Sequence, residues 1–326
     1  MATRVVRNTA ILCKPEVTPG TDSVPTGAAN AMLPTKEGLS ITPISIEMVN
    51  RDVLRPYLGA SEQLPGTRFV ELAWTVEMVG SGTVATAPPW GAPLRGCGFA
   101  EILTALTRAD YLPITDAMEA MSIYWHDSGV LHKCIGSRAG GGIKLVQGDS
   151  PKLMLKYRGL YVTPTAVAQP ATTLTPWKVP QVVTNANSGQ VMFGCTHDDE
   201  VAPALVGGTA YPSQGLEIDF GISNPFTPFL GAETVDITDR AMTGKVTMDL
   251  TAAQEVAFYA AIEAATLSSI GLQHGTVANQ RVMAYAPAVQ MTNPQKVDIN
   301  GKRCMAYDLR FLPVDGNDEL RIVTSF

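Results

Sequence analysis

One irregular phrase occurs twice in this sequence and limits what the chain can fold into more than any other feature. It reads RPYLGASE at residues 55–62 and TPFLGAET at residues 227–234. Pro56 and Pro228 stand 172 positions apart, and an aromatic residue, Leu and Gly follow each of them in the same order. Such a phrase is not a simple core pattern, so its recurrence predicts that a whole structural unit is duplicated.

The residues after each phrase predict a strand in matching register. In RFVELAWTVEM (68–78), Trp74 belongs to an apolar set that alternates with polar or small residues. This period of two is typical of a half-buried strand. At the same separation, GKVTMDL (244–250) has Val246 at the position of Trp74. We therefore expect two domains of one topology in which these two residues are equivalent.

A helix is predicted after the second strand, with a weaker counterpart in the first copy. Thr251 and Gln254 fit a capping box, in which each side chain satisfies a free backbone N–H at the start of a helix. An apolar stripe follows at helical spacing: Phe258, Ala261, Ile262 and Ala265. The first copy reads TAPPWGAPLRGCGF (86–99) here, and its prolines and glycines predict a shorter helix.

Further paired segments extend the duplication along the chain. A hairpin is predicted in both WHDSGVLHK (125–133) and QHGTVANQR (273–281). The residues between the copies are rich in Pro, Thr and Ala, which predicts an extended linker. The predicted organisation is a first domain at 1–163, a linker at 164–181 and a second domain at 182–326. Each domain is expected to be β-rich with one flanking helix.

The composition supports a β-rich chain and excludes several classes of function. Charged residues make up 17% of the 326 residues, and Gly (29) and Pro (23) are common, which favours strands joined by frequent turns. Residues 1–163 carry 15 Lys and Arg against 14 Asp and Glu, whereas residues 164–326 carry 9 against 16. The net charges are therefore +1 and −7, and neither half has the basic surface of a nucleic-acid-binding protein.

Cysteine usage and hydropathy point to a chain made in the cytoplasm. The five cysteines are odd in number and never form C-x-x-C, which predicts no disulfide framework and a reducing compartment. No apolar run reaches the length of a membrane span, and the first residues do not resemble a signal peptide.

No group of titratable residues predicts catalysis or metal binding. His197 is followed by an acidic run, Asp198–Glu200, but adjacent loop residues rarely converge on one ion, so a solvated acidic loop is favoured. His126, His132 and Cys134 lie at a predicted hairpin tip, where a buried Cys is favoured over a Cys–His nucleophile pair.

Two Gly-rich stretches also lack the pattern that a binding site requires. Residues 80–83 and 139–144 match neither a phosphate-binding loop nor G-x-G-x-x-G, and both are interpreted as flexible turns. We therefore expect no enzymatic activity, no cofactor and no metal.

Several longer stretches carry a resemblance to a known family. They are TPGTDSVPTGAANAML (18–33), RDVLRPYLG (51–59), GSGTVATAPPWGAPLRGCGFAE (80–101), GLYVTPT (159–165), ITDRAMTGKVTM (237–248), SIGLQHGT (269–276) and GNDEL (316–320). Through them the chain resembles the tail tube proteins of long-tailed bacteriophages, in the form that carries two tube domains in one polypeptide. The resemblance spans nearly the full length, and its motifs are packing and loop phrases rather than catalytic signatures.

The resemblance implies a fold and an assembly. Each domain would be a tail-tube-like β-sandwich or half-barrel with a flanking helix, and neighbouring subunits would join their sheets into a ring-shaped β-barrel. Three duplicated chains would fill the ring that six single-domain chains form. Stacked rings would make a tube that conducts the genome during ejection, which places the protein in the virion tail after synthesis in the host bacterial cytoplasm.

The resemblance also implies partners. These are further copies of the same chain, the tape-measure, tail terminator and distal tail proteins, and double-stranded genomic DNA that passes without specific binding. No membrane partner is implied. Because a basic wall would hold the DNA, and because the C-terminal half carries the acidic excess, we expect a lumen with a net negative wall. The alternative is that the acidic excess lies on the outside of the tube, since the sequence does not fix which face is which.

The loops that carry the repeated phrase are the predicted contact sites. A loop present in both copies is expected to serve more than one local turn, so we expect it to contact a neighbouring subunit or the next ring. The residues concerned are Pro56, Tyr57, Leu58, Gly59, Pro228, Phe229, Leu230 and Gly231.

Two other functions remain open from the sequence. The chain can be another virion component that shares the fold, such as a tail terminator, distal tail or tube-initiator protein. From a different class, it can be a carbohydrate-binding or enzymatic β-sandwich, which requires convergent polar groups or an exposed aromatic platform.

Overall fold

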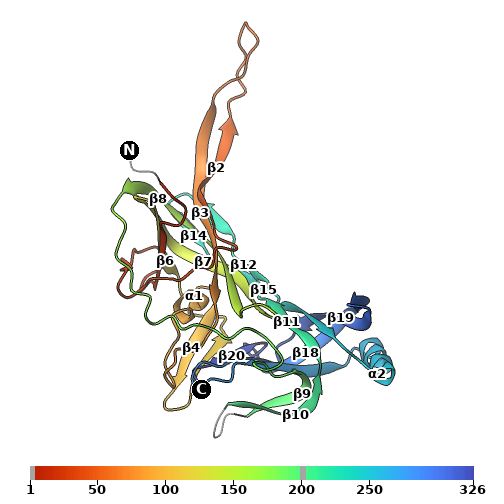
Figure 1. Cartoon of the computed structure of the whole chain (residues 1–326). Coiled ribbons are helices and arrows are strands. Elements are labelled where there is room, and N and C mark those ends of the chain that lie inside the picture. Colours follow the sequence, from red (N-terminus) through yellow and green to blue (C-terminus); the bar gives the residue numbers. More distant parts are fainter. Residues whose placement is uncertain (1–3, 199–202) are drawn as a thin grey trace.

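Strands are the dominant regular structure of the chain (Figure 1), as seen in a computed structural model that describes residues 4–198 and 203–326. The strands are β1 Thr9–Pro15, β2 Ser40–Asn50, β3 Gln63–Glu77, β4 Phe99–Thr104, β5 Arg108–Pro113, β6 Met121–Asp127, β7 Val130–Val146, β8 Lys152–Ala166, β9 Val191–Asp198, β10 Ala204–Tyr211, β11 Ser213–Asp219, β12 Ile222–Ser223, β13 Phe226–Phe229, β14 Ala232–Val235, β15 Asp239–Arg240, β16 Thr243–Met248, β17 Leu267–His274, β18 Val282–Ile299, β19 Lys302–Phe311 and β20 Arg321–Thr324. The helices are α1 Gly91–Arg95 and α2 Ala252–Glu263. The prediction of a mainly β fold is confirmed.

One large antiparallel sheet contains most of the strands. Its main path runs β10-β9-β17-β18-β19-β16-β11-β7-β8-β3-β2, and β1, β4, β5, β6 and β20 pair beside this path. Two small ladders, β12–β15 and β13–β14, are separate from it. Within the described residues the end strands β10 and β2 are not paired with each other, so the sheet of a single chain stays open rather than closing into a barrel.

The two halves of the chain use the same strand order. In the first half the order is β1-β6-β7-β8-β3-β2, and in the second half it is β9-β17-β18-β19-β16-β11. The cross-strand registers also correspond. Ile41 faces Leu72 in the first half, and Ile218 faces Gly244 in the second. Trp74 faces Leu155, and Val246 faces Tyr307.

These four pairs define which positions of the two halves are structurally equivalent. Residues of β11 follow their β2 counterparts by 177 positions, those of β16 follow β3 by 172, and those of β19 follow β8 by 152. The separation of 172 is the one that the repeated phrase predicts from sequence.

The halves are joined by two strand pairings. β7 pairs with β11, from Gly142 opposite Asp219 to Val146 opposite Gly215. β5 pairs with β20, and across this second junction Arg321 Nε donates to Asp110 Oδ1 at 3.1 Å. The sheet is therefore continuous from one half of the chain to the other.

The Gly-rich stretch 139–144 lies inside β7, so its interpretation as a flexible turn is wrong. A Cβ atom on Gly142 would lie 2.3 Å from the backbone oxygen of Ile218, and one on Gly141 would lie 2.1 Å from that of Met154. The glycines allow close approach of the strands on either side of β7, which is a known use of glycine within strands. Residues 80–83 do form a loop of bends, as predicted.

The core lies on one face of the sheet and runs through both halves. Alternate residues of β3 are buried, as the period of two predicts, and Trp74 stacks on Tyr157 with ring centroids 4.9 Å apart. In the second half, Val246 and Tyr307 are buried at the equivalent positions. Burial of such large apolar side chains is the main stabilising contribution to a sheet of this size.

Both helices pack on the core side of the sheet. α2 begins with the predicted capping box of Thr251 and Gln254, and Phe258 is its buried contact with the core. α1 is limited to five residues, as the prolines and glycines around it predict, and the Tyr157 hydroxyl donates to the Pro93 carbonyl oxygen. Helices on one face leave the other face of the main sheet uncovered by helix.

The linker is extended but closely packed. β8 continues to Ala166, so regular structure reaches three residues into the predicted linker at 164–181. Trp177 is buried, and its indole N–H donates to the Ala31 carbonyl oxygen at 3.0 Å. The segment therefore lies along the N-terminal residues of the first half instead of hanging free.

No helix of the described residues is both long enough and apolar enough to cross a membrane.

Candidate assembly surfaces

The β2–β3 hairpin forms an arm, defined here as residues 43–69, that projects away from the body of the molecule (Figure 1). Its tip, residues 51–62, connects the two strands without regular structure. All four predicted contact residues of the first copy are exposed there, and Leu58 is 102% exposed. Apolar side chains continue down the arm, where Met48 and Val49 are also exposed. An apolar extension of this kind is typical of a surface that is covered in an assembly.

The second copy of the phrase forms the β13–β14 hairpin, which is shorter. Phe229 faces Ala232, so Leu230 and Gly231 make a two-residue turn, and Gly231 has the positive φ of +94° that glycine adopts without strain. Leu230 is 107% exposed, and Pro228 is also exposed. The tips of both copies are therefore free of contacts with the rest of the chain.

The base of this second hairpin lies on the first half of the molecule. The Asn224 side-chain amide donates to the Arg138 carbonyl oxygen at 2.8 Å, and Arg158 Nη1 donates to the Asn224 carbonyl oxygen at 3.3 Å. The Phe226 ring packs on Phe69 with centroids 5.2 Å apart. The segment between β11 and β16 thus crosses β7 and β8 and reaches β3.

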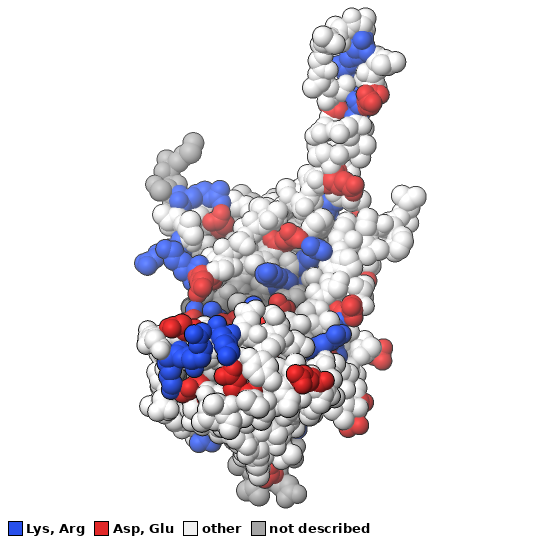
Figure 2. Space-filling view, turned by 90° about the vertical axis from the view of Figure 1, so that its right-hand side faces the viewer, with Lys and Arg blue, Asp and Glu red and all other residues white. Residues whose placement is uncertain are grey.

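The uncovered face of the main sheet carries charges of both signs. Cross-strand pairs place these residues on that face: Glu71, Glu77, Lys144, Lys152, Lys156, Arg158, Glu217, Asp219, Lys245, Asp308 and Arg310. Two ion pairs connect neighbouring strands, Arg158–Glu71 at 2.7 Å and Lys144–Glu217 at 3.5 Å. Figure 2 shows acidic and basic residues interspersed over the visible surface rather than separated into large patches.

Among the described residues, the unpaired strand edges include those of β2 and of the C-terminal part of β18. β2 pairs with β3 on one side only. β18 pairs with β17 over residues 282–290, but from Met291 to Ile299 its only neighbour is β19. The β2 edge is the first-half equivalent of the β11 edge, and the β18 edge is the second-half equivalent of the β7 edge. Inside the chain, β11 and β7 pair with each other. Unpaired edges bind further strands readily, so both are candidate contact surfaces.

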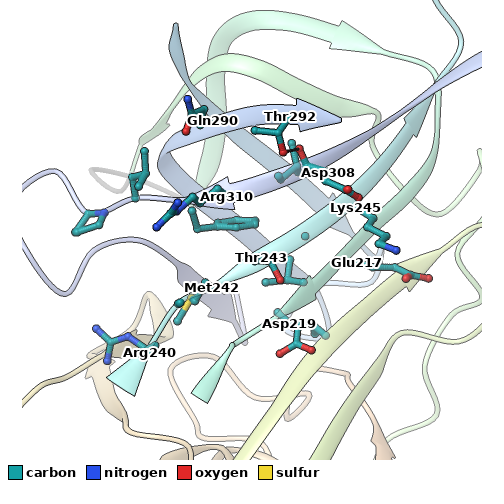
Figure 3. A pocket seen from close by; sticks show the side chains of 18 of the residues that line it. Glu217, Asp219, Arg240, Met242, Thr243, Lys245, Gln290, Thr292, Asp308 and Arg310 are labelled. Atoms are coloured by element: carbon teal, nitrogen blue, oxygen red, sulfur yellow. Dashed lines mark hydrogen bonds between the residues drawn. The ribbon is translucent and has the colours of Figure 1, made fainter. Parts of the chain in front are cut away.

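A hollow of about 830 Å³ lies on the uncovered face of the second half (Figure 3). Its walls come from β11, β16, β18 and β19, and Lys245 and Arg310 point into it. Asp308 is held at its side by Asn293, whose amide donates to the carboxylate at 2.8 Å. Across the described ranges, neither Lys245 nor Arg310 has an ion pair or a side-chain hydrogen bond.

Sequence reasoning missed this hollow and the free edge of β18. Both features could have been found by recognising that Arg158 and Arg310 are equivalent residues. That equivalence requires aligning β19 with β8 at a separation of 152 positions. That separation becomes evident only when the strand registers are known.

Within the described residues, no group of three or more His, Cys, Asp or Glu side chains is placed to hold a metal ion. The Cys134 thiol is buried, and burial raises its pKa, whereas a nucleophilic cysteine needs a lowered pKa. Burial lowers the pKa of His126, which lies on β6. His197 Nδ1 lies 3.2 Å from the Arg321 guanidinium, a poor position for a metal ligand. Asp198 ends β9, and Asp199 and Glu200 lie outside the described residues.

The comparisons with known proteins address the whole chain. No curated protein sequence matches it significantly. The family model described as phage tail tube protein matches residues 7–311, which is nearly the full length and includes both halves. With an uncovered sheet face, free strand edges and exposed apolar tips already evident in the fold, this match establishes that the chain belongs to the phage tail tube protein family and is a structural component of the virion tail.

Proposed function

We propose that this chain is the repeating subunit of the tail tube, that three copies close a ring, and that stacked rings enclose the lumen through which the genome is ejected. The observation that carries the proposal is the equivalence of the two halves. Residues 1–163 and 182–326 act as two tube domains joined by the linker at 164–181. The shared strand order and the corresponding registers support this division.

Each ring closes by repeating between chains the junction that joins the halves within a chain. Inside the chain, β11 of the second half lies beside β7 of the first. The equivalents of these strands are β2 and β18, and both have an unpaired edge in a single chain. Pairing β2 of one copy with β18 of the next makes every domain-to-domain contact alike and removes both edges.

The register of the new junction follows from the internal one. Glu217 lies opposite Lys144 inside the chain. Ser40 is the equivalent of Glu217, and Val297 is the equivalent of Lys144 once the register shift in β18 is included. Ser40 of one copy is therefore placed opposite Val297 of the next, with Thr42 opposite Gln295.

The ring has room for duplex DNA. Each half contributes four strands to the proposed wall. In the first half they are β7, β8, β3 and β2, and in the second half they are β18, β19, β16 and β11. For about twenty-four strands spaced ~4.8 Å apart and tilted by ~40°, the circumference is about 150 Å and the backbone diameter about 48 Å. Side chains on the wall reduce the free diameter to roughly 35–40 Å, which exceeds the width of the duplex.

The uncovered face of the sheet forms the wall of the lumen in this proposal. Its charges are nearly balanced, so the wall is mixed in sign rather than net negative, which revises our expectation from the acidic excess of the second half. Ion pairs such as Arg158–Glu71 occupy basic side chains that otherwise bind phosphate. The carboxylates interspersed on the same face keep its net charge close to zero, so few counterions are released on contact and DNA passes without sticking.

The exposed tips connect this ring to its surroundings. Leu58 and Leu230, with the Pro, aromatic and Gly residues beside them, contact a neighbouring subunit or the next ring. At its two ends the tube meets the tail terminator and distal tail proteins, and the tape-measure protein occupies the lumen before ejection. These partners are proposed from family membership.

A disulfide ladder tests the ring. Ser40→Cys and Val297→Cys are introduced into one chain, assembled chains are oxidised, and the products are separated under denaturing, non-reducing conditions. The native cysteines are all buried, but Cys304 lies opposite Val297 across the β18–β19 pair, so the test chain also carries Cys304→Ser to prevent an intrachain disulfide. Exhaustive oxidation should end at covalent trimers, because a closed ring has three junctions. A ladder that continues to six chains, or an absence of cross-links in tubes seen by electron microscopy, contradicts the proposal. Ser40→Cys alone is the control.

A further inference from the structure

The hollow of the second half has an equivalent in the first half, and that equivalent is partly filled. The cavity of the first half is lined by Ser40, Thr42, Glu71, Ala73, Lys156 and Arg158. The corresponding positions line the hollow of the second half: Glu217, Asp219, Thr243, Lys245, Asp308 and Arg310. Agreement at six positions on three strands of each half shows that the two cavities are the same surface in two copies.

The difference between the two cavities is the presence of a covering segment. In the first half, Asn224 from the segment between β11 and β16 is part of the lining, and the cavity measures about 320 Å³. In the second half no such segment enters from the described residues, and the hollow measures about 830 Å³. The larger hollow is therefore a binding site whose covering segment is not supplied by the described residues of the same chain.

The missing segment is identified by the same equivalence. The segment between β11 and β16 corresponds to the segment between β2 and β3, which is the arm. Within them, Ile222 faces Arg240 and Ile46 faces Arg68, and the two arginines keep the separation of 172. In its own chain the arm projects away from the body, so it does not reach the hollow of the same molecule (Figure 1).

We propose that the hollow binds the arm of a second copy of this chain, and that Arg310 holds it. The inference rests on the proposed ring, because pairing β2 with the β18 edge of the next copy brings the arm to that copy's hollow. The stem of the arm, residues 43–50 and 63–69, then crosses β18 and β19 of the next copy. This repeats between chains the crossing of β7 and β8 by the segment between β11 and β16 within one chain. The tip remains free to extend beyond the hollow.

Arg310 is available to bind the arm because it lacks the ion pair that its equivalent, Arg158, forms with Glu71. Arg158 donates to the Asn224 carbonyl oxygen and is also paired with Glu71. Arg310 stands at the equivalent position, but Thr243 replaces the carboxylate, so the guanidinium is left without a partner within the described part of the chain. The stem carries one carboxylate close to Ile46, that of Glu47, which is exposed. Within its own chain the Glu47 carboxylate accepts a hydrogen bond from Thr67 Oγ1 at 3.4 Å and has no ion pair among the described residues. A charge-assisted hydrogen bond between Glu47 and Arg310 of the next copy supplies the partner that Arg310 lacks.

Charge reversal tests the anchor with full-length chains. Arg310→Glu is expected to raise the critical concentration for polymerisation by about tenfold or more, because it places two carboxylates together. Arg303→Glu, on the same strand but outside the hollow, is the matched control and should leave polymerisation unchanged. Adding Glu47→Arg to Arg310→Glu should recover polymerisation. Equal critical concentrations for Arg310→Glu and Arg303→Glu, with both proteins folded by circular dichroism, overturn the anchor.

A second cross-link keeps the docking itself testable. Glu47→Cys combined with Arg310→Cys should give interchain disulfides in assembled protein and none in dilute monomer. If wild-type chains form no rings or tubes, the proposed function fails. If tubes form and the Ser40–Val297 cross-link is obtained while the Glu47–Arg310 cross-link is absent, the function stands and the docking of the arm is overturned.

Discussion

Replacing Gly142 by Ala should weaken the junction between the two halves. The new Cβ would lie 2.3 Å from the Ile218 backbone oxygen and 3.2 Å from the Asp219 Cα. Gly142 does not have a positive φ, so the substitution adds no backbone strain and its effect is steric. The clash is with backbone rather than a flexible side chain, so β11 must move away from β7.

The size of the effect follows from what that movement breaks. Separating Gly142 from Asp219 and Ile143 from Ile218 removes about two backbone hydrogen bonds, at ~0.5–1.5 kcal/mol each. Overpacking next to the core adds about 1–3 kcal/mol. We expect a loss of about 2–6 kcal/mol in the free energy of unfolding at this junction. Gly189→Ala is the matched control, since its Cβ meets nothing closer than 3.4 Å and its φ is not positive.

Urea denaturation of dilute monomer measures the effect. Tryptophan fluorescence reports on Trp74, Trp90 and Trp125 in the first half, and far-ultraviolet circular dichroism reports on all strands. Gly142→Ala should lower the midpoint and separate the two transitions, because the halves then unfold less cooperatively. Coincident transitions with the midpoint of Gly189→Ala would refute the argument that the glycine permits the close approach.

Two further predictions concern assembly and pH. Leu58→Asp with Leu230→Asp should give folded protein that does not polymerise, because both side chains are fully exposed in the monomer and the proposed contacts would bury them; normal tubes from this double variant contradict the contact role of the tips. Burial lowers the pKa of His274 below 6.5, although its hydrogen bond to the Gln181 carbonyl oxygen opposes the shift. The unfolded chain therefore binds the proton first, and stability present above pH 6.5 should fall as the pH drops from 6.5 to the lower folded value, by about 1.4 kcal/mol for each unit of the shift. Thermal melting across pH 7.5–5 checks this, and His274→Gln should lose part of the dependence; an unchanged acid slope in that variant contradicts the assignment.

Features with a local pattern were predictable from the sequence. The alternation around Trp74 and the capping box of Thr251 each depend on residues close in the chain, and both are present in the structure. The hairpin at 125–133 is also present, with Ser128 and Gly129 as its two-residue turn. The repeated phrase indicated the separation of 172 because β3 and β16 follow it without insertions.

Features that depend on distant partners were not predictable. Glycines at 140–142 read as a turn, because nothing in the local sequence shows that β11 must approach β7 there. The same limit applies to the segment after β9: from Ala204 to Tyr211 it forms β10, paired with β9, whereas residues 199–202 lie outside the described ranges. The hollow was missed because its significance depends on a covering segment. That segment, between β11 and β16, lies over the equivalent cavity of the first half and has no counterpart over the hollow of the second half within the described residues. Comparison of the two halves after folding reveals it.

The strand that completes the edge of β5 is made long after β5 itself. Arg321 follows Arg108 by 213 residues, so at roughly 5–20 residues per second a ribosome adds β20 about 10–40 s later. Throughout that interval the β5 edge of the nascent first half stays unpaired, and Asp110 lacks its hydrogen bond from Arg321. On a polysome, identical nascent chains lie close together. The rate at which β20 reaches β5 therefore decides whether a chain completes its own sheet or exchanges strands with its neighbour.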